Sequence, residues 1–397
     1  MTQHEFQVAD NAAVEPAALI GAAADSSHDT RDTGLILTKD DIKNLRKYEI
    51  AGLALPTALN DVITYLGYET GAGHELEAVD FQKTFELIHG HASLWNPLRN
   101  DLLTVNDQLV MFAGLMQVYG ESIIEVLDGI RALTLAEEHD IKSLEELRQL
   151  ESQWDHKFPE IHPVDREDLG AYLDDILKQV RVQEAEAQNI KKRLDAFGFD
   201  LPNKVGAAIS LKLSAINKNT LGVEVKALQT AIDERAAEIE RRNKEYDHLV
   251  KEAISSIAGG GGLIMMIYSS VKAEDVRTKR NDLRATQERD IQAMDKKNSI
   301  LGSLNRVRND LQNLGIVVLD ADIATKNLIT MWNGLNTFIS QSSRAINDIN
   351  DALLLRRFSH QFKLVVRPWK NIEVDAQKLR DVFAAADREI QEEWKSA

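Results

Sequence analysis

Apolar residues recur at alternating spacings of four and three along two stretches of this sequence, residues 165–250 and 272–355. Such a heptad repeat requires helices that bury one seam against a neighbouring helix. In the first stretch the seam passes through Ile176, Val180, Gln183, Ala187, Ile190, Leu194, Phe197, Leu221, Val225, Leu228, Ile232, Ile239 and Tyr246. In the second stretch it passes through Leu283, Ile291, Met294, Leu301, Leu304, Leu311, Leu314, Leu328, Leu335, Ile339, Ile346, Ile349 and Leu353. Because a short connector joins two stretches of equal length, the sequence predicts an antiparallel coiled-coil neck, with a kink at Pro202.

The rest of the composition agrees with an all-α fold. Ala, Leu, Glu, Gln, Lys and Arg, which are good helix formers, are abundant, and only seven prolines occur among 397 residues. We predict an elongated helical bundle, the tail, with the long antiparallel neck and a small apolar head tip. The predicted parts are a disordered lead-in over 1–37, a tail over 38–164 completed by 356–397, a neck over 165–250 and 272–355 that runs back into the tail, and a head over 251–271.

Local signals set some of the expected helix boundaries. Thr38, followed three residues later by Asp41, resembles a capping box and predicts a helix start. Asn96-Pro97 predicts an interruption, and Asp165 after Pro163 predicts the cap of a new helix. The run 108–120 carries no charge, but at 13 residues it is too short to span a bilayer. We expect it to be a helix buried on nearly all sides of a bundle.

The connector between the two neck stretches holds 19 consecutive uncharged residues, 253–271. That length matches a transmembrane helix, but four adjacent glycines divide it into arms of six and nine residues, too short to cross a bilayer. An interfacial tip suits the composition better, and Tyr268 suits the head-group level. The predicted membrane-interacting residues are Ile254, Ile257, Gly259, Gly260, Gly261, Gly262, Leu263, Ile264, Met265, Met266, Ile267 and Tyr268. An ordinary glycine turn that caps the bundle end remains the alternative. A phosphate-binding loop is weaker, because no Gly-Lys-Ser/Thr follows the glycines.

The flanks of the connector differ in charge from the rest of the chain. The formal net charge is −16, which argues against a nucleic-acid partner and against a surface that is adhesive to anionic lipid everywhere. Between residues 241 and 284, however, nine Lys and Arg residues stand against six Asp and Glu. We therefore expect Lys251, Lys272 and Arg277 to contact lipid head groups, and any membrane contact to be local.

Residue patterns that would carry catalysis are missing from the sequence. There is no cysteine, which excludes disulfides, thiolate catalysis and Cys-based zinc sites. The histidine pairs His89/His91 and His156/His162 have no metal-ligand context, and we expect no catalytic site, metal or cofactor. The first residues lack a secretory leader, so a protein of this kind acting outside the cell would leave without a classical signal peptide.

This layout resembles the cytolysin-A-type α-helical pore-forming toxins, and within them the A component of the binary alpha-xenorhabdolysin (Xax/Yax) cytotoxins. The resemblance rests on the acidic, cysteine-free helical chain, the long neck and the 254–268 head segment. It implies a soluble subunit with a tail, neck and head that associates with the host-cell membrane. It also implies a separate B-component subunit and a hetero-oligomeric ring that forms a lytic pore. Both components share the general layout, which leaves the A or B assignment open.

Two other readings stay open at this point. A cytoplasmic coiled-coil scaffold or membrane-tethering protein would use the same neck as a spacer. An enzyme with an unrecognised site is the third possibility. Release of dye from liposomes or of haemoglobin from red cells would distinguish a pore former from a scaffold.

Overall fold

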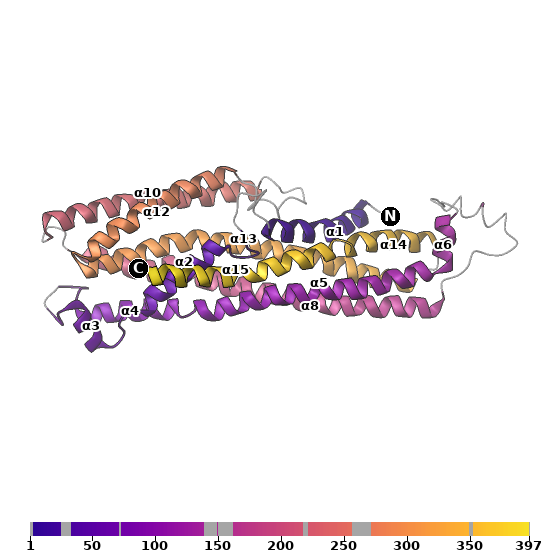
Figure 1. Ribbon diagram of the computed structural model, residues 1–397, viewed down its shortest axis with the longest axis horizontal. Helices are drawn as coiled ribbons and strands as arrows, with labels where there is room; N and C mark the ends of the chain where they lie inside the picture. Colours follow the sequence, from indigo (N-terminus) through magenta and orange to yellow (C-terminus); the bar gives the residue numbers. More distant parts are fainter. Residues whose placement is uncertain are drawn as a thin grey trace. The chain divides into compact units, whose positions relative to one another are not determined.

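The computed structural model describes residues 3–24, 33–70, 73–138, 149, 162–216, 221–255, 271–348 and 352–396. The described elements are α1 Gln3–Ala24, α2 Lys39–Leu53, α3 Leu59–Leu66, α4 Ala78–Ala92, α5 Trp95–Gly129, α6 Arg131–Glu138, α8 Pro163–Asp200, the π-helical turn η1 Leu201–Gly206, α9 Ala207–Ala215, α10 Val223–Ser255, α12 Val271–Asp295, α13 Ser299–Asp348, α14 Ala352–Val366 and α15 Trp369–Ser396 (Figure 1). No strand occurs in these ranges. The prediction of an all-α fold is confirmed.

The described chain divides into two compact units. Unit 1 comprises residues 1–24, 104–188 and 326–380, and unit 2 comprises residues 25–103, 189–325 and 381–397. Helices α5, α8, α13 and α15 each contribute residues to both units.

Helix starts follow the local signals. Thr38 and Asp41 form the predicted capping box, in which each side chain accepts a hydrogen bond from the other residue's backbone N–H, at 3.2 and 3.0 Å. The predicted interruption at Asn96-Pro97 lies two residues upstream, where α4 ends at Ala92 and α5 begins at Trp95. Helix α8 begins at Pro163, and Asp165 lies in its first turn instead of capping it. Proline at the first helical position is favourable because its missing N–H has no intrahelical partner there.

The part of the first heptad seam that lies on α8 is buried as predicted, whereas Leu221, Val225 and Leu228 further along it are only partly buried. Ile176, Val180, Gln183, Ala187, Ile190, Leu194 and Phe197 are each at most 7% exposed. At Pro202 the helix does not break but passes through the π-helical turn η1 before continuing as α9. Proline has no N–H for the backbone ladder, and one wider turn accommodates this without ending the helix.

The two-arm neck requires a correction. Helix α12 ends at Asp295, and residues 296–298 form a turn before α13 begins at Ser299. Two contacts show that the chain reverses its direction at this turn. Arg306 pairs with Asp295 at 2.8 Å, and a Cβ on Gly302 would lie 2.6 Å from the Cα of Asp295. Helix α10 therefore packs against both α12 and α13 in unit 2, as its contacts through Tyr246 show. Heptad spacing alone does not reveal the reversal, because the apolar repeat continues on both sides of the turn.

The N-terminal lead-in was expected to be disordered, and this is wrong for Gln3–Ala24, which form α1. Leu19 and Ile20 are fully buried, and α1 packs on α14 within unit 1. The sequence pattern misses this helix because much of its buried face is alanine, which gives little contrast with the exposed positions. Residues 25–32 of the lead-in lie outside the described residues, and Leu35, Ile36 and Leu37 at its end are buried.

The core of unit 1 is aromatic. Phe112 contacts Trp332 and Trp369 edge to face, with ring centroids 4.8 and 4.9 Å apart, and all three side chains are buried. Helix α5 reaches α14 closely at Gly120, where a Cβ would lie 2.5 Å from Val366. Three helices, α5, α13 and α15, thus meet at one aromatic cluster.

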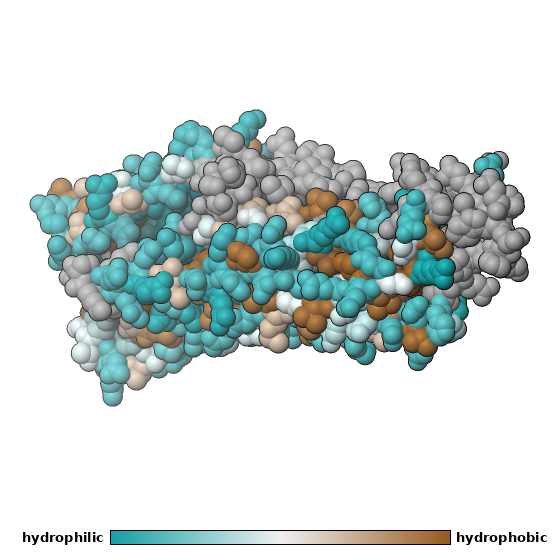
Figure 2. Space-filling model, turned by 45° about the vertical axis from the view of Figure 1, so that its right-hand side comes forward, coloured by the Kyte–Doolittle hydropathy of each residue, from teal (hydrophilic) through white to brown (hydrophobic). Residues whose placement is uncertain are grey.

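The uncharged run 108–120 has one buried face, not several. Phe112 and Met116 are buried, but Met111 is 68% and Val118 is 62% exposed. In the described part of the chain, the stretch Ala78–Gly129 is long and apolar enough to cross a membrane by length and composition, a test that core helices of soluble proteins also pass. The face in Figure 2 likewise shows apolar surface in patches among polar surface.

Candidate membrane-interacting site

The predicted tip is only partly within the described residues. Residues 256–270, which include Ile257, the four glycines and Leu263–Tyr268, lie outside them. Ile254 and Lys251 belong to the last turns of α10, and Lys272 and Arg277 belong to the start of α12. Helices α10 and α12, to which the tip is attached, are described on both sides of it.

Helices α10 and α12 run antiparallel and side by side (Figure 1). The guanidinium of Arg235 lies 2.5 Å from the carboxylate of Asp290, and near the other end Tyr246 packs on Ala273 and Val276. Both contacts join residues about equally far from the connector along the chain. The uncharged connector therefore links two adjacent helix ends, Ser255 and Val271.

An apolar cluster lies between α10, α12 and α13, close to these two helix ends. It consists of Tyr246, Ala273, Val276 and Ile316, with the partly buried Leu249, Val250 and Leu319 packed against it. Because α13 supplies Ile316 and Leu319, the hairpin of α10 and α12 is supported by a third helix at this level.

A buried polar group adjoins this cluster, and we call Asp41, Tyr246, Arg277 and Asp320 the Arg277 cluster. The Arg277 guanidinium lies 3.4 Å from Asp320 and 3.5 Å from Asp41. The Tyr246 hydroxyl donates to Asp320 Oδ1 at 2.7 Å. The carboxylates are at most 2% exposed and Arg277 is 11% exposed. The cluster joins α2, α10, α12 and α13 within unit 2.

Arg277 was expected to contact lipid head groups, and its position does not favour that role. Its guanidinium is engaged by two buried carboxylates, so little of it is presented to solvent. Lys272, by contrast, is exposed. Lys251 is helical, and its side chain lies outside what the structure describes.

Two further arginines of α12 point into the same interior. Arg280 is 3% exposed, and burial, with repulsion from Arg284 and Arg277, lowers its pKa to about 9. Burial also lowers the pKa of Arg284. One turn further on, Gln287 is fully buried. Between Arg277 and Gln287 the inner face of α12 is therefore polar, in contrast to Ile291 and Met294 at the other end of the helix.

The local excess of positive charge is mostly neutralised within the protein. Arg241 and Arg242 both pair with Glu238, and Lys279 pairs with Asp275 at 2.6 Å. The count of basic residues in the sequence thus overstates the positive surface beside the connector.

The Arg277 cluster was missed from the sequence, although a signal for it existed. Continuing the seam of α12 backwards from Met294 and Ile291 with the same spacing reaches Gln287, Arg284, Arg280 and Arg277. Charged residues at consecutive seam positions indicate a buried polar layer, because the repeat still directs them inward.

The histidines show no metal site. His91 is buried, its Nδ1 accepts from the Tyr48 hydroxyl at 2.8 Å, and its Nε2 donates to the Phe197 carbonyl at 3.1 Å. His156 lies outside the described residues, within which no three His, Asp or Glu side chains gather as metal ligands would.

Three solved structures illustrate what the chain is similar to. YaxA from Yersinia enterocolitica matches at 26% identity over 90% of this chain and 99% of its own, with a TM-score of 0.49. The XaxAB pore complex from Xenorhabdus nematophila matches at 26% identity over 90% and 100%, with a TM-score of 0.46. Soluble SmhA, of the tripartite alpha-pore forming toxin Smh from Serratia marcescens, matches at 11% identity over 94% of each chain, with a TM-score of 0.52.

The Xax and Yax toxins are the ones that the sequence resembles, and the chain is similar to members of both. The likeness to SmhA shows the all-α fold alone. No family model and no curated protein matches the sequence.

Proposed function

We propose that this chain is a subunit of an α-helical pore-forming toxin that contacts the target membrane through residues 254–268. The observation that carries the proposal is the antiparallel pairing of α10 and α12, whose adjacent ends belong to one run of 19 uncharged residues, 253–271. An apolar segment of this size, with Lys251 and Lys272 at its two ends, is suited to the interface of a bilayer. The all-α fold, which the chain shares with SmhA, is compatible with this function.

A partner subunit is part of the proposal. The arms of the connector hold six and nine residues and are too short to cross hydrocarbon as helices. A subunit of this kind docks on the bilayer, and a second subunit supplies most of the lipid-spanning wall in a hetero-oligomeric ring. The sequence resemblance to the A component of the Xax/Yax toxins supports this division. The protein would be secreted and then associate with the host membrane.

Dye release tests the function directly. The purified chain is added to liposomes and to red cells, alone and with the product of a neighbouring gene of similar length and helical composition. Release that requires both proteins supports the proposal. Absence of release and of lipid binding under both conditions would favour the alternative, a coiled-coil scaffold.

A double variant tests the tip. Ile264→Asp with Met266→Asp should abolish flotation with liposomes while the helical circular dichroism signal is unchanged. The matched control is Val223→Asp with Val374→Asp, at positions 87% and 55% exposed, which introduces the same charge away from the connector. If the tip variant floats as well as the control, the tip does not bind lipid.

A further inference from the structure

A groove of about 890 Å³ opens in unit 2 beside the π-helical turn. One wall is formed by the end of α8, η1 and α9, the opposite wall by two turns of α10 from Glu240 to Asp247, and the floor by α13. The wider turn is the local cause, because its extra residue displaces the backbone between Leu201 and Gly206. The volume lies within the range of about 300–1,000 Å³ found for ligand pockets.

Small residues keep the floor of the groove open. Gly315 of α13 is exposed, and a Cβ at this position would meet no heavy atom within 4 Å. On the opposite wall Ala207 and Ser210 are exposed and short. A ligand could therefore approach the backbone of α13 closely.

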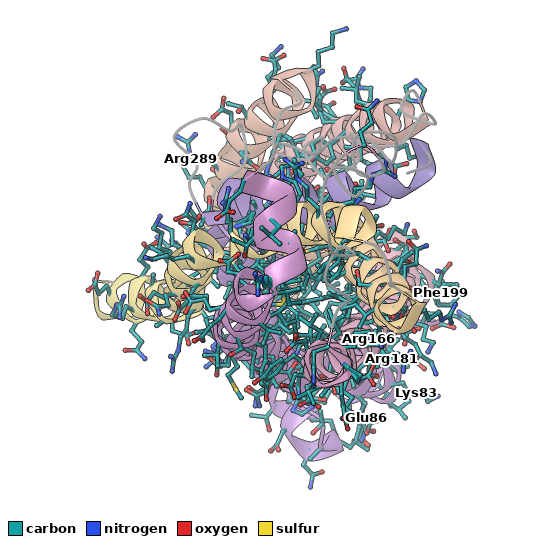
Figure 3. The ribbon with its side chains drawn as sticks, turned by 90° about the vertical axis from the view of Figure 1, so that its right-hand side faces the viewer. Lys83, Glu86, Arg166, Arg181, Phe199 and Arg289 are labelled. Atoms are coloured by element: carbon teal, nitrogen blue, oxygen red, sulfur yellow. The ribbon has the colours of Figure 1, made fainter. Side chains whose placement is uncertain are left out.

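An aromatic ring stands at the edge of the groove. Phe199 is 63% exposed and lies at the outer edge of the drawn side chains (Figure 3). Burial of a phenylalanine is normally favourable, so an exposed ring at the edge of a groove is available to stack on a ligand.

Two amide side chains in the groove have a fixed orientation. Asn243 Nδ2 donates to the backbone carbonyl of Gln312 at 2.6 Å, and Gln312 Nε2 donates to that of Ala236 at 2.9 Å. A backbone carbonyl only accepts, so the NH₂ ends must lie on that side. The amide oxygens, Asn243 Oδ1 and Gln312 Oε1, are buried and have no hydrogen-bond partner. They are acceptors that lack a donor.

The charged side chains of the groove are already paired. Asp195 and Asp322 both contact the Lys191 ammonium, at 2.6 and 3.0 Å. Arg308 pairs with Asp233 at 2.9 Å. Paired charges favour a neutral polar ligand over a phosphate or a polyamine. The groove is open along one side, whereas an acyl chain needs an enclosed apolar cavity.

We propose that this groove binds a neutral saccharide. Sugar hydroxyl groups would donate to the amide oxygens after a small side-chain movement and to the carboxylates of the rim. The apolar face of a sugar ring would stack on Phe199. The proposal does not rest on pore formation, because it concerns the chain without lipid or partner.

Binding is measured with the full chain on an array of neutral and anionic glycans, and then by saturation-transfer NMR with the neutral glycans that bind. Phe199→Ala should weaken binding at least fivefold, because it removes the stacking surface from an exposed position. Gly315→Gln should weaken it at least tenfold by filling the groove, from a position whose added Cβ meets no heavy atom within 4 Å.

Matched controls separate binding from folding. Gly334→Gln changes another glycine of α13 whose added Cβ meets nothing within 4 Å, outside the groove. Val223→Ala truncates a side chain that is 87% exposed. Both should bind as the original chain does. Absence of binding to every neutral glycan, binding to anionic glycans alone, or equal binding by the groove and control variants would each overturn the proposal.

Discussion

Arg277 and Asp320 face each other between α12 and α13, with Arg277 Nη1 3.4 Å from a carboxylate oxygen that is fully buried. Asp41, from the first turn of α2, lies 3.5 Å from the same guanidinium. One arginine thus joins three helices that are far apart in the sequence. Removing one partner of such a buried pair leaves an uncompensated charge, which is why these contacts lead to large expected effects.

Asp320→Asn should lower the free energy of unfolding by about 3 kcal/mol, because Arg277 loses one buried counter-charge. Urea denaturation followed by circular dichroism measures the change. The control is Asp275→Asn, whose partner Lys279 is 57% exposed, and its expected effect is within about 0.5 kcal/mol. Equal losses in the two variants would show that the buried pair contributes no more than a surface pair.

His91 should make unfolding depend on pH. Burial lowers its pKa below 6.5, so the unfolded chain binds a proton before the folded chain does. Stability is therefore complete above pH 6.5 and falls as the pH drops from there to the folded pKa. His91→Gln should show a shallower decline of unfolding free energy between pH 7 and 5. Identical slopes would mean that His91 titrates alike in both states.

The contribution of Asp310 to the free energy of unfolding should have the opposite pH dependence. Burial raises its pKa from 3.8 to about 6, despite attraction from Arg284, so the folded chain holds its proton longer. Its charged form therefore destabilises the fold as the pH rises through 3.8 to about 6. Asp310→Asn should stabilise the protein by roughly 1–3 kcal/mol at pH 7.5, at about 1.4 kcal/mol per pKa unit. The gain should vanish at pH 3.5, and destabilisation at pH 7.5 would contradict the assignment.

Two glycines of α5 should respond oppositely to alanine. At Gly120 the new methyl group would lie 2.5 Å from Val366, so Gly120→Ala should destabilise by about 1–3 kcal/mol. At Gly114 nothing lies within 4 Å, so Gly114→Ala should stabilise by up to about 1 kcal/mol through helix propensity. Adding Val366→Ala should recover part of the loss at Gly120. Thermal and urea unfolding measure all three, and a stabilising Gly120→Ala would rule out the close approach of α5 and α14.

Lys272→Glu tests the charge beside the connector under the proposed function. Each charge near an anionic surface contributes about 1 kcal/mol at low ionic strength, so reversal should reduce binding to phosphatidylserine vesicles by about tenfold or more. Binding to neutral vesicles should change little. Lys83→Glu, which alters the net charge equally at an exposed position (Figure 3), is the control in the same flotation assay. A loss of the same size in the control would indicate a general charge effect.

Periodicity and local chemistry predicted much of this protein from its sequence. The capping box at Thr38, the helix break before Pro97 and the buried seam of α8 each depend on residues close in sequence, so spacing alone identifies them. The uncharged connector is likewise a property of composition.

Only the tertiary structure decided where the chain reverses and what the seam of α12 contacts. A heptad repeat specifies that one face is buried, but not by which helix. The turn at 296–298 and the groove beside Pro202 therefore had no unambiguous signal in the sequence. The basic flank of the connector is the clearest case. The sequence determined that an arginine occurs at position 277. Only the fold brings Asp41 and Asp320 to it, so that its charge is neutralised inside the protein by two buried carboxylates.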